Sequence, residues 1–101
     1  MVDRVREVTW STSARVALDE VVAYIDQASP QNARLVLTDA LAAAGSLAHL
    51  AERGRIVPEL GDPALRQLLV RGFRLMYQVT ATTVTVVAFL RSRRDFTLPP
   101  A

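Results

Sequence analysis

The stretch RQLLVRGFRLMYQVTATTVTVVAFLRSRRDF, residues 66–96, carries the strongest strand pattern in the chain. Apolar side chains occupy every second position from Phe73 to Val79, with Arg74, Met76 and Gln78 between them. This period of two is typical of a strand with one buried face. The dipeptide Arg71-Gly72 predicts a tight turn before this strand, because glycine tolerates a positive φ. The whole stretch therefore predicts a β-meander that ends in a basic edge.

The third run of the meander, residues 84–90, is apolar at nearly every position and rich in β-branched residues. A strand of this kind is expected in the interior of a sheet, with both faces covered. Strict alternation puts Val84, Val86, Ala88 and Leu90 on one face and Thr85, Val87 and Phe89 on the other. The connection from Thr80 to Thr83 contains no Gly, Asn or Pro, so its turn type stays open.

The first half of the chain predicts one strand and two helices. Residues 4–10 alternate as a short strand that pairs with the meander. Apolar residues at spacings of three and four then predict a helix over residues 12–27, capped by Ser11 or Ser13. Ser29-Pro30 ends this helix and begins a second one. The second helix runs toward Gly54, which suits a left-handed C-terminal position.

Residues 55–65 hold two Pro and one Gly and connect the second helix to the meander. The resulting order is β-α-α-β-β-β, an α+β fold in which an antiparallel helical hairpin packs on a small, mainly antiparallel sheet. At 101 residues we expect a single domain, residues 1–101, that gains stability from a partner.

Composition points to a cytoplasmic protein. The longest apolar run is too short to span a bilayer, so we expect no membrane partner. The N-terminus lacks the apolar region of a secretory signal. The chain has no Cys, which fits a reducing compartment.

Charge is distributed unevenly along the chain. Residues 1–65 carry six Arg and nine acidic residues, a net −3, whereas residues 66–101 carry six Arg and one Asp, a net +5. The basic half is the meander, and the candidate binding residues at its turns and strand ends are Arg71, Arg74, Arg91, Arg93 and Arg94. If they converge on one rim, that rim suits phosphates or an acidic protein surface. The alternative is that they are solubilising charges paired with the acidic residues of the first half.

Enzyme chemistry has few candidate residues here. His49 is the only histidine and Cys is absent, which excludes a Cys–His nucleophile and a Cys-based zinc site within one chain. A phosphate-binding loop of the GxxxxGK type is also absent. We therefore assign no catalytic residue, no metal site and no cofactor. Aromatic residues such as Trp10 and Phe89 are interpreted as core rather than as base-stacking platforms.

The order of elements and three phrases resemble the RelE/ParE toxin superfamily of type II toxin–antitoxin systems, and within it the ParE branch. The phrases are VTWSTSARVALDEVVAYI, GRIVPELGDPALRQLLVRGFRLMYQV and VVAFLRSRRDF. The resemblance covers nearly the whole chain. It implies a growth-arresting toxin that inhibits DNA gyrase by binding it and is neutralised by a cognate antitoxin. It also implies a toxin–antitoxin heteromer, with a dimer or a heterotetramer as possible assemblies.

Two alternatives stay open. RelE-like members cut messenger RNA on the ribosome, and here Arg74, Arg91 and Arg93 would lie on the phosphate. RelE-type toxins commonly add a C-terminal Tyr or His, whereas this chain has Phe96, which cannot exchange a proton. The other alternative is a degenerate toxin that only binds its antitoxin. The chain also has Arg91-Ser92 where the ParE pattern often has His-Gly.

The terminal arginines predict a division of roles. Neighbours in an extended chain point to opposite sides, so Arg93 shares the side of Arg91, and Arg94 faces the other way. We expect Arg91 and Arg93 to face the target or the antitoxin. We expect Arg94 to pair with a carboxylate and hold the end of the strand.

Overall fold

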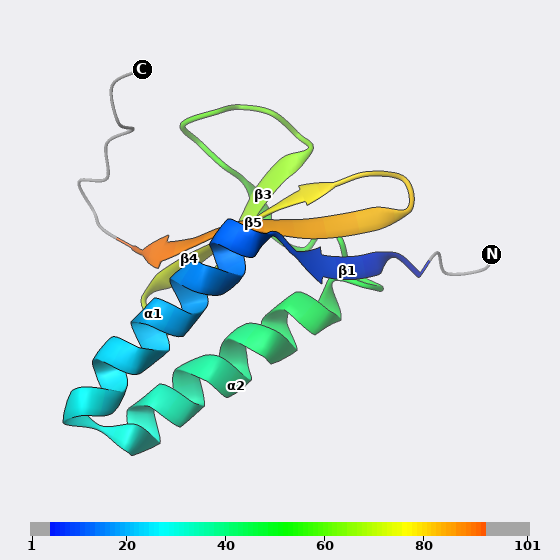
Figure 1. Cartoon of the computed structure of the whole chain (residues 1–101). Coiled ribbons are helices and arrows are strands. Elements are labelled where there is room, and N and C mark those ends of the chain that lie inside the picture. Colours follow the sequence, from blue (N-terminus) through cyan, green and yellow to red (C-terminus); the bar gives the residue numbers. More distant parts are fainter. Residues whose placement is uncertain (1–4, 93–101) are drawn as a thin grey trace.

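Two helices lie against one face of a five-stranded sheet in the computed structural model, which describes residues 5–92 (Figure 1). The elements in chain order are β1 (Glu7–Trp10), α1 (Thr12–Ala28), α2 (Pro30–Ser46), β2 (Arg55–Ile56), β3 (Leu65–Val70), β4 (Phe73–Val79) and β5 (Thr83–Arg91). The predicted α+β fold with a helical hairpin is confirmed. The one addition is β2, a two-residue strand in the segment that the sequence predicted as a connection.

The strand order in the sheet is β1-β5-β4-β3-β2. β1 runs parallel to β5, and every other pair is antiparallel, so the sheet is mainly antiparallel as predicted. β5 is an interior strand. The turn between β3 and β4 has φ of 48° at Arg71 and 84° at Gly72, two consecutive left-handed residues that suit a two-residue hairpin.

Both helices begin where the serines predict. The Ser11 hydroxyl accepts a hydrogen bond from the Ala14 amide at 3.1 Å, and the Ser29 hydroxyl accepts one from the Asn32 amide at 3.1 Å. Pro30 occupies the first turn of α2, where its missing N–H costs no helical hydrogen bond. Ser11 rather than Ser13 is therefore the cap of α1.

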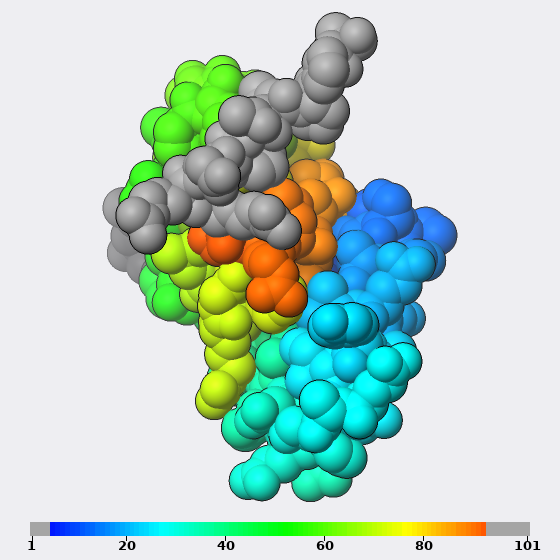
Figure 2. Space-filling model, turned by 90° about the vertical axis from the view of Figure 1, so that its left-hand side faces the viewer, coloured from blue at the N-terminus to red at the C-terminus, as the bar shows by residue number. Residues whose placement is uncertain are grey.

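The core lies between the helical hairpin and the sheet. Its fully buried members come from both helices, from the turn after α2 and from the two central strands: Leu18, Ala40, Leu47, Leu75, Tyr77, Val84 and Val86. The end of the hairpin at which α1 joins α2 extends beyond the edge of the sheet (Figure 1). Figure 2 shows the end of β5 lying between α1 and the turn that joins β3 to β4.

A β-bulge in β5 corrects the predicted faces of that strand. Met76 of β4 pairs with Ala88, but the next residue, Tyr77, pairs with Val86, so Val87 is an extra residue in β5. The strict alternation predicted from the sequence therefore fails after Val86. Phe89, instead of Ala88, is buried on the side of the helices.

The predicted end of the second helix was also wrong. α2 ends at Ser46, and turns follow to residue 52. Gly54 is not left-handed; the glycines with positive φ are Gly61 and Gly72. Gly54 is needed because a side chain would not fit here: its amide donates a 3.0 Å hydrogen bond to the buried Tyr77 hydroxyl, which lies against the backbone. A Cβ at this position would lie 2.5 Å from that oxygen.

Because of this packing, replacement by Ala should change the free energy of unfolding in opposite directions at Gly54 and at Gly45. In Gly54→Ala the new Cβ meets both the Tyr77 hydroxyl and the backbone oxygen of Gln67, at 2.6 Å. We expect a loss of about 1–3 kcal/mol in the free energy of unfolding, typical of overpacking. In Gly45→Ala, within α2, the Cβ meets nothing within 4 Å. Ala is a better helix former than Gly, so we expect a gain of about 0.5–1 kcal/mol.

Urea denaturation of both variants beside the parent protein measures these changes. A Gly54→Ala protein as stable as the parent would contradict the assigned contact with Tyr77.

Candidate partner-binding groove

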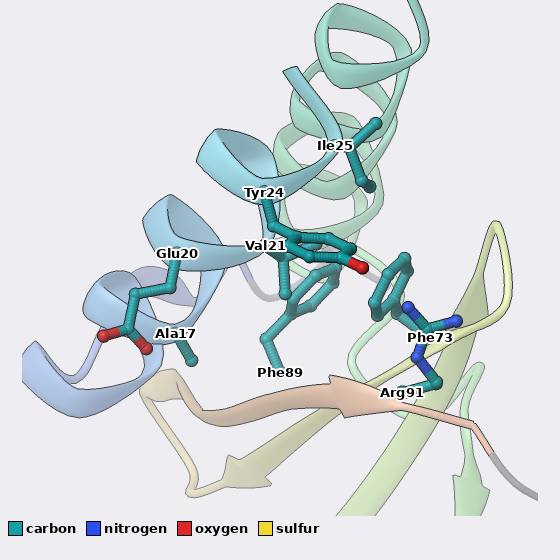
Figure 3. Close-up of a pocket in the computed structure, with 8 residues that line it drawn as sticks. All are labelled: Ala17, Glu20, Val21, Tyr24, Ile25, Phe73, Phe89 and Arg91. Atoms are coloured by element: carbon teal, nitrogen blue, oxygen red, sulfur yellow. The ribbon is translucent and has the colours of Figure 1, made fainter. Parts of the chain in front are cut away.

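An open groove of about 280 Å³ lies between α1 and the ends of β4 and β5 (Figure 3). Five of its lining residues come from α1 and three from the strands: Ala17, Glu20, Val21, Tyr24, Ile25, Phe73, Phe89 and Arg91. The residues from α1 recur at spacings of three and four, so they form one face of the helix. Phe73 and Arg91 are directly paired in the sheet.

The floor of the groove is aromatic. The rings of Phe73 and Phe89 are stacked, with centroids 5.2 Å apart and an interplanar angle of 17°. The Trp10 ring is tilted against Phe89, with centroids 6.4 Å apart and an interplanar angle of 50°. The guanidinium of Arg91 lies over the Phe73 ring, 5.5 Å from its centroid, a cation–π contact. This contact holds the side chain at the edge of the groove, although Arg91 remains exposed.

The upper wall is formed by Tyr24, whose residue surface is 69% exposed even though its ring lies above the aromatic floor (Figure 3). Glu20 lies toward the opposite end of the groove from Arg91 (Figure 3). The groove is therefore apolar along its length, with a carboxylate at one end and a guanidinium at the other. Exposed apolar surface that is bordered by charges is typical of a site for a protein or peptide partner.

The structure places the predicted arginines in different environments. Arg71 lies at the β3–β4 turn and forms an exposed ion pair with Asp39 of α2. It lies at the same end of the sheet as Arg91, since the Ser92 amide donates to the Gly72 carbonyl at 2.8 Å. Arg93 and Arg94 lie outside the described residues, so their predicted division of roles stays a prediction.

Arg74 does not belong to an exposed rim, which corrects the prediction that it converges there with the others. It is 4% exposed and faces away from the helices. Its guanidinium donates two hydrogen bonds to the carboxylate of Glu59, at 2.9 and 3.0 Å, and another to the Gln67 side chain at 2.8 Å from Nε. The physical reason is parity, because Arg74 alternates with Phe73 and Leu75, which are buried on the side of the helices.

The pair between Arg74 and Glu59 fixes the segment that joins β2 to β3 against the sheet. The hydrogen bonds from Arg74 lower the pKa of the Glu59 carboxyl below its usual value of 4.5, and this effect outweighs the rise caused by desolvation. The pKa of Tyr77, on the other face, is raised by burial of its hydroxyl. Neither group lines the groove.

Among residues 5–92, no group of three or more His, Asp or Glu side chains is placed to hold a metal ion. His49 is exposed. Glu20 and Tyr24 line the groove but were not predicted from the sequence as site residues. A usable signal was present, because residues 17, 20, 21 and 24 have helical spacing beside the buried stripe of α1.

A small α+β domain with an open apolar groove and an exposed cation is a domain equipped to bind a partner. Residues 8–96 match a family described as the ParE toxin of type II toxin–antitoxin system, parDE. The chain therefore belongs to the ParE toxin family of type II toxin–antitoxin systems. The predicted resemblance is thereby confirmed.

A solved structure described as a chromosomal ParDE system from P. aeruginosa has the same fold, with a TM-score of 0.74. The two chains are 18% identical, and the match covers 89% of this chain and 99% of the other. No match is found among curated proteins. Within residues 5–92, none of the helices has the length and apolar character needed to cross a membrane.

The lowered pKa of Glu59 predicts how stability depends on pH. Because the folded state favours the ionised carboxylate, its contribution is present above about pH 4.5 and is lost as the pH falls through the lower pKa of the folded state. We expect Glu59→Gln to lower the free energy of unfolding most at neutral pH. The difference from the parent protein should shrink below pH 4.5.

Denaturant titrations between pH 3 and pH 7 measure this difference, and Asp19→Asn is the matched control. Asp19 forms an exposed ion pair with Arg15 one helical turn away, and exposed pairs contribute only about 0–1 kcal/mol. A difference between Glu59→Gln and parent that does not change with pH would refute the role given to the Arg74–Glu59 pair.

Proposed function

We propose that this chain is a toxin that inhibits DNA gyrase by binding it and does not catalyse a reaction. Membership of the ParE family supports this function, since ParE toxins are not generally enzymes. The observation that carries the proposal is the exposed Arg91 beside an apolar groove. This combination provides recognition, with a fixed cation and aromatic surface. Within the part of the chain that the structure describes, the groove lining contains no histidine, because His49 lies in a different pocket.

The ribonuclease alternative loses one of its expected residues. Phosphodiester cleavage of that kind needs cations on the scissile phosphate and groups that transfer protons. Arg74 was one of the three expected cations, and it is buried in a bidentate pair with Glu59 on the face opposite the groove. Arg91 alone remains exposed among the expected cations within residues 5–92.

The groove is proposed as the binding site of the cognate antitoxin. The structural relative is a ParDE system, which supports an antitoxin as the partner. A helix with one apolar face would cover Phe89, Val21 and Tyr24, in the manner of other helix-in-groove complexes. The charges specify its direction, because an acidic residue of the helix would pair with Arg91 and a basic residue with Glu20. The same contacts would serve a toxin–antitoxin dimer or heterotetramer in the cytoplasm.

A supercoiling assay tests the proposed target. We expect the purified chain to block supercoiling by gyrase and to stabilise the cleavage complex, and we expect Arg91→Ala/Arg93→Ala to lose most of this inhibition. Exposed charges contribute about 0–1 kcal/mol to folding, so the double variant should keep its melting temperature. The matched control is Arg15→Ala/Arg34→Ala, which removes two exposed arginines from the helices.

Gyrase that supercoils normally in the presence of the folded parent protein would refute the proposed target. Growth arrest with normal supercoiling would favour the ribosome and messenger RNA as the target. Expression without growth arrest would favour a chain that only binds its antitoxin.

A further inference from the structure

The arginines at the two ends of the sheet have different partners. At the end where β5 terminates, Arg71 pairs with Asp39 and Arg74 with Glu59, whereas Arg91 packs on the Phe73 ring. Arg15 on α1 pairs with Asp19. The opposite end, where β1 and β5 begin, carries Arg6, Arg53 and Arg66, which we call the Arg6 cluster. No member of the Arg6 cluster forms an ion pair with a carboxylate of the described residues.

Neutral oxygens hold each member of the Arg6 cluster in place. Arg6 donates from Nε to the Thr80 carbonyl at 2.8 Å, and Arg53 donates to the Ser46 hydroxyl at 2.8 Å. Arg66 donates to the carbonyls of Gly54 at 3.0 Å and Pro63 at 3.1 Å. These bonds restrict the guanidinium groups without neutralising them.

The three side chains surround one short segment. Arg6 and Arg53 line an open pocket of about 280 Å³ together with His49, Leu50, Ala51 and Glu52. Arg66 reaches the same segment from the sheet, because its Nη1 contacts the carbonyls of Glu52 and Gly54 on either side of Arg53. Among residues 5–92, Glu52 is the single carboxylate of this pocket lining, and it forms an ion pair with neither arginine.

Guanidinium groups that are oriented and not paired with carboxylates bind phosphates well, because two N–H donors can face the oxygens of one phosphate. Among the described residues, the lining of this pocket contains no Phe, Tyr or Trp, and its one ring is the imidazole of His49. Single-stranded nucleic acids are usually bound by stacking bases on aromatic rings, so this surface suits the backbone of a duplex better.

We propose that the Arg6 cluster binds the phosphate backbone of double-stranded DNA. The cluster lies at the opposite end of the sheet from Arg91, so a partner in the groove leaves it accessible. The proposal does not depend on gyrase as the target, because free duplex is sufficient to test it.

Fluorescence anisotropy of a labelled duplex of about 20 base pairs, titrated with the purified full chain at several KCl concentrations, measures this binding. We expect Arg6→Gln/Arg53→Gln to weaken binding about tenfold at low salt and to reduce the slope of log K against log salt by about 2, one for each phosphate contact. Arg53→Gln alone, at an exposed side chain that donates to the Ser46 hydroxyl, should reduce the slope by about 1. This single variant keeps the proposal testable if the double variant does not fold.

The matched control is Arg15→Gln/Arg34→Gln, which removes the same charge from exposed positions on the two helices. We expect it to bind duplex nearly as the parent does. Equal losses of duplex affinity in the two double variants would show that binding depends only on net charge, and this result would overturn the proposal. Failure of the parent protein to bind duplex at low salt would overturn it as well, whatever the outcome with gyrase.

Discussion

The bulge at Val87 is the constraint on which the partner-binding groove depends. β5 faces the helices with Val84 and Val86, and the extra residue brings Phe89 to that same face. Phe89 can then stack on Phe73 under α1. The extra residue also places Arg91 over Phe73 at the groove. Strict alternation after Val86 would have directed Leu90 to this position. One inserted residue thus determines which side chains the end of β5 presents to a partner.

The two faces of the sheet divide the arginines by role. On the face away from the helices, Arg74 is buried against Glu59 and Gln67 and serves the fold. A buried ion pair contributes little to the net free energy of folding, but loss of one partner leaves the other charge buried and is costly. Arg74 therefore cannot leave Glu59 to bind a partner without destabilising the fold. On the helix side, Arg91 packs on an aromatic ring and remains exposed. Arg71, Arg74 and Arg91 belong to the same meander, but they do not form one shared surface.

Local signals predicted most of the fold. The serine caps, Pro30 and the Arg71-Gly72 turn act within a few residues, and all are confirmed. The bulge could not be predicted, because it arises from the pairing of Tyr77 with Val86 between strands. Gly54 was misinterpreted for a similar reason, since its requirement comes from the distant Tyr77 hydroxyl. For the groove, the sequence predicted Arg91 but not Tyr24 or Glu20, because the site forms only where α1 meets β5.

We propose that the bulge creates the groove and that the antitoxin binds in it. The most direct measurement is NMR cross-saturation from the cognate antitoxin to the isotope-labelled toxin in their complex. We expect saturation to reach the side chains of Tyr24, Phe73, Phe89 and Arg91, and to leave Leu69 and Met76 on the other face of the sheet unaffected. Saturation centred on Leu69 and Met76, with Tyr24 and Phe89 unaffected, would contradict this proposal.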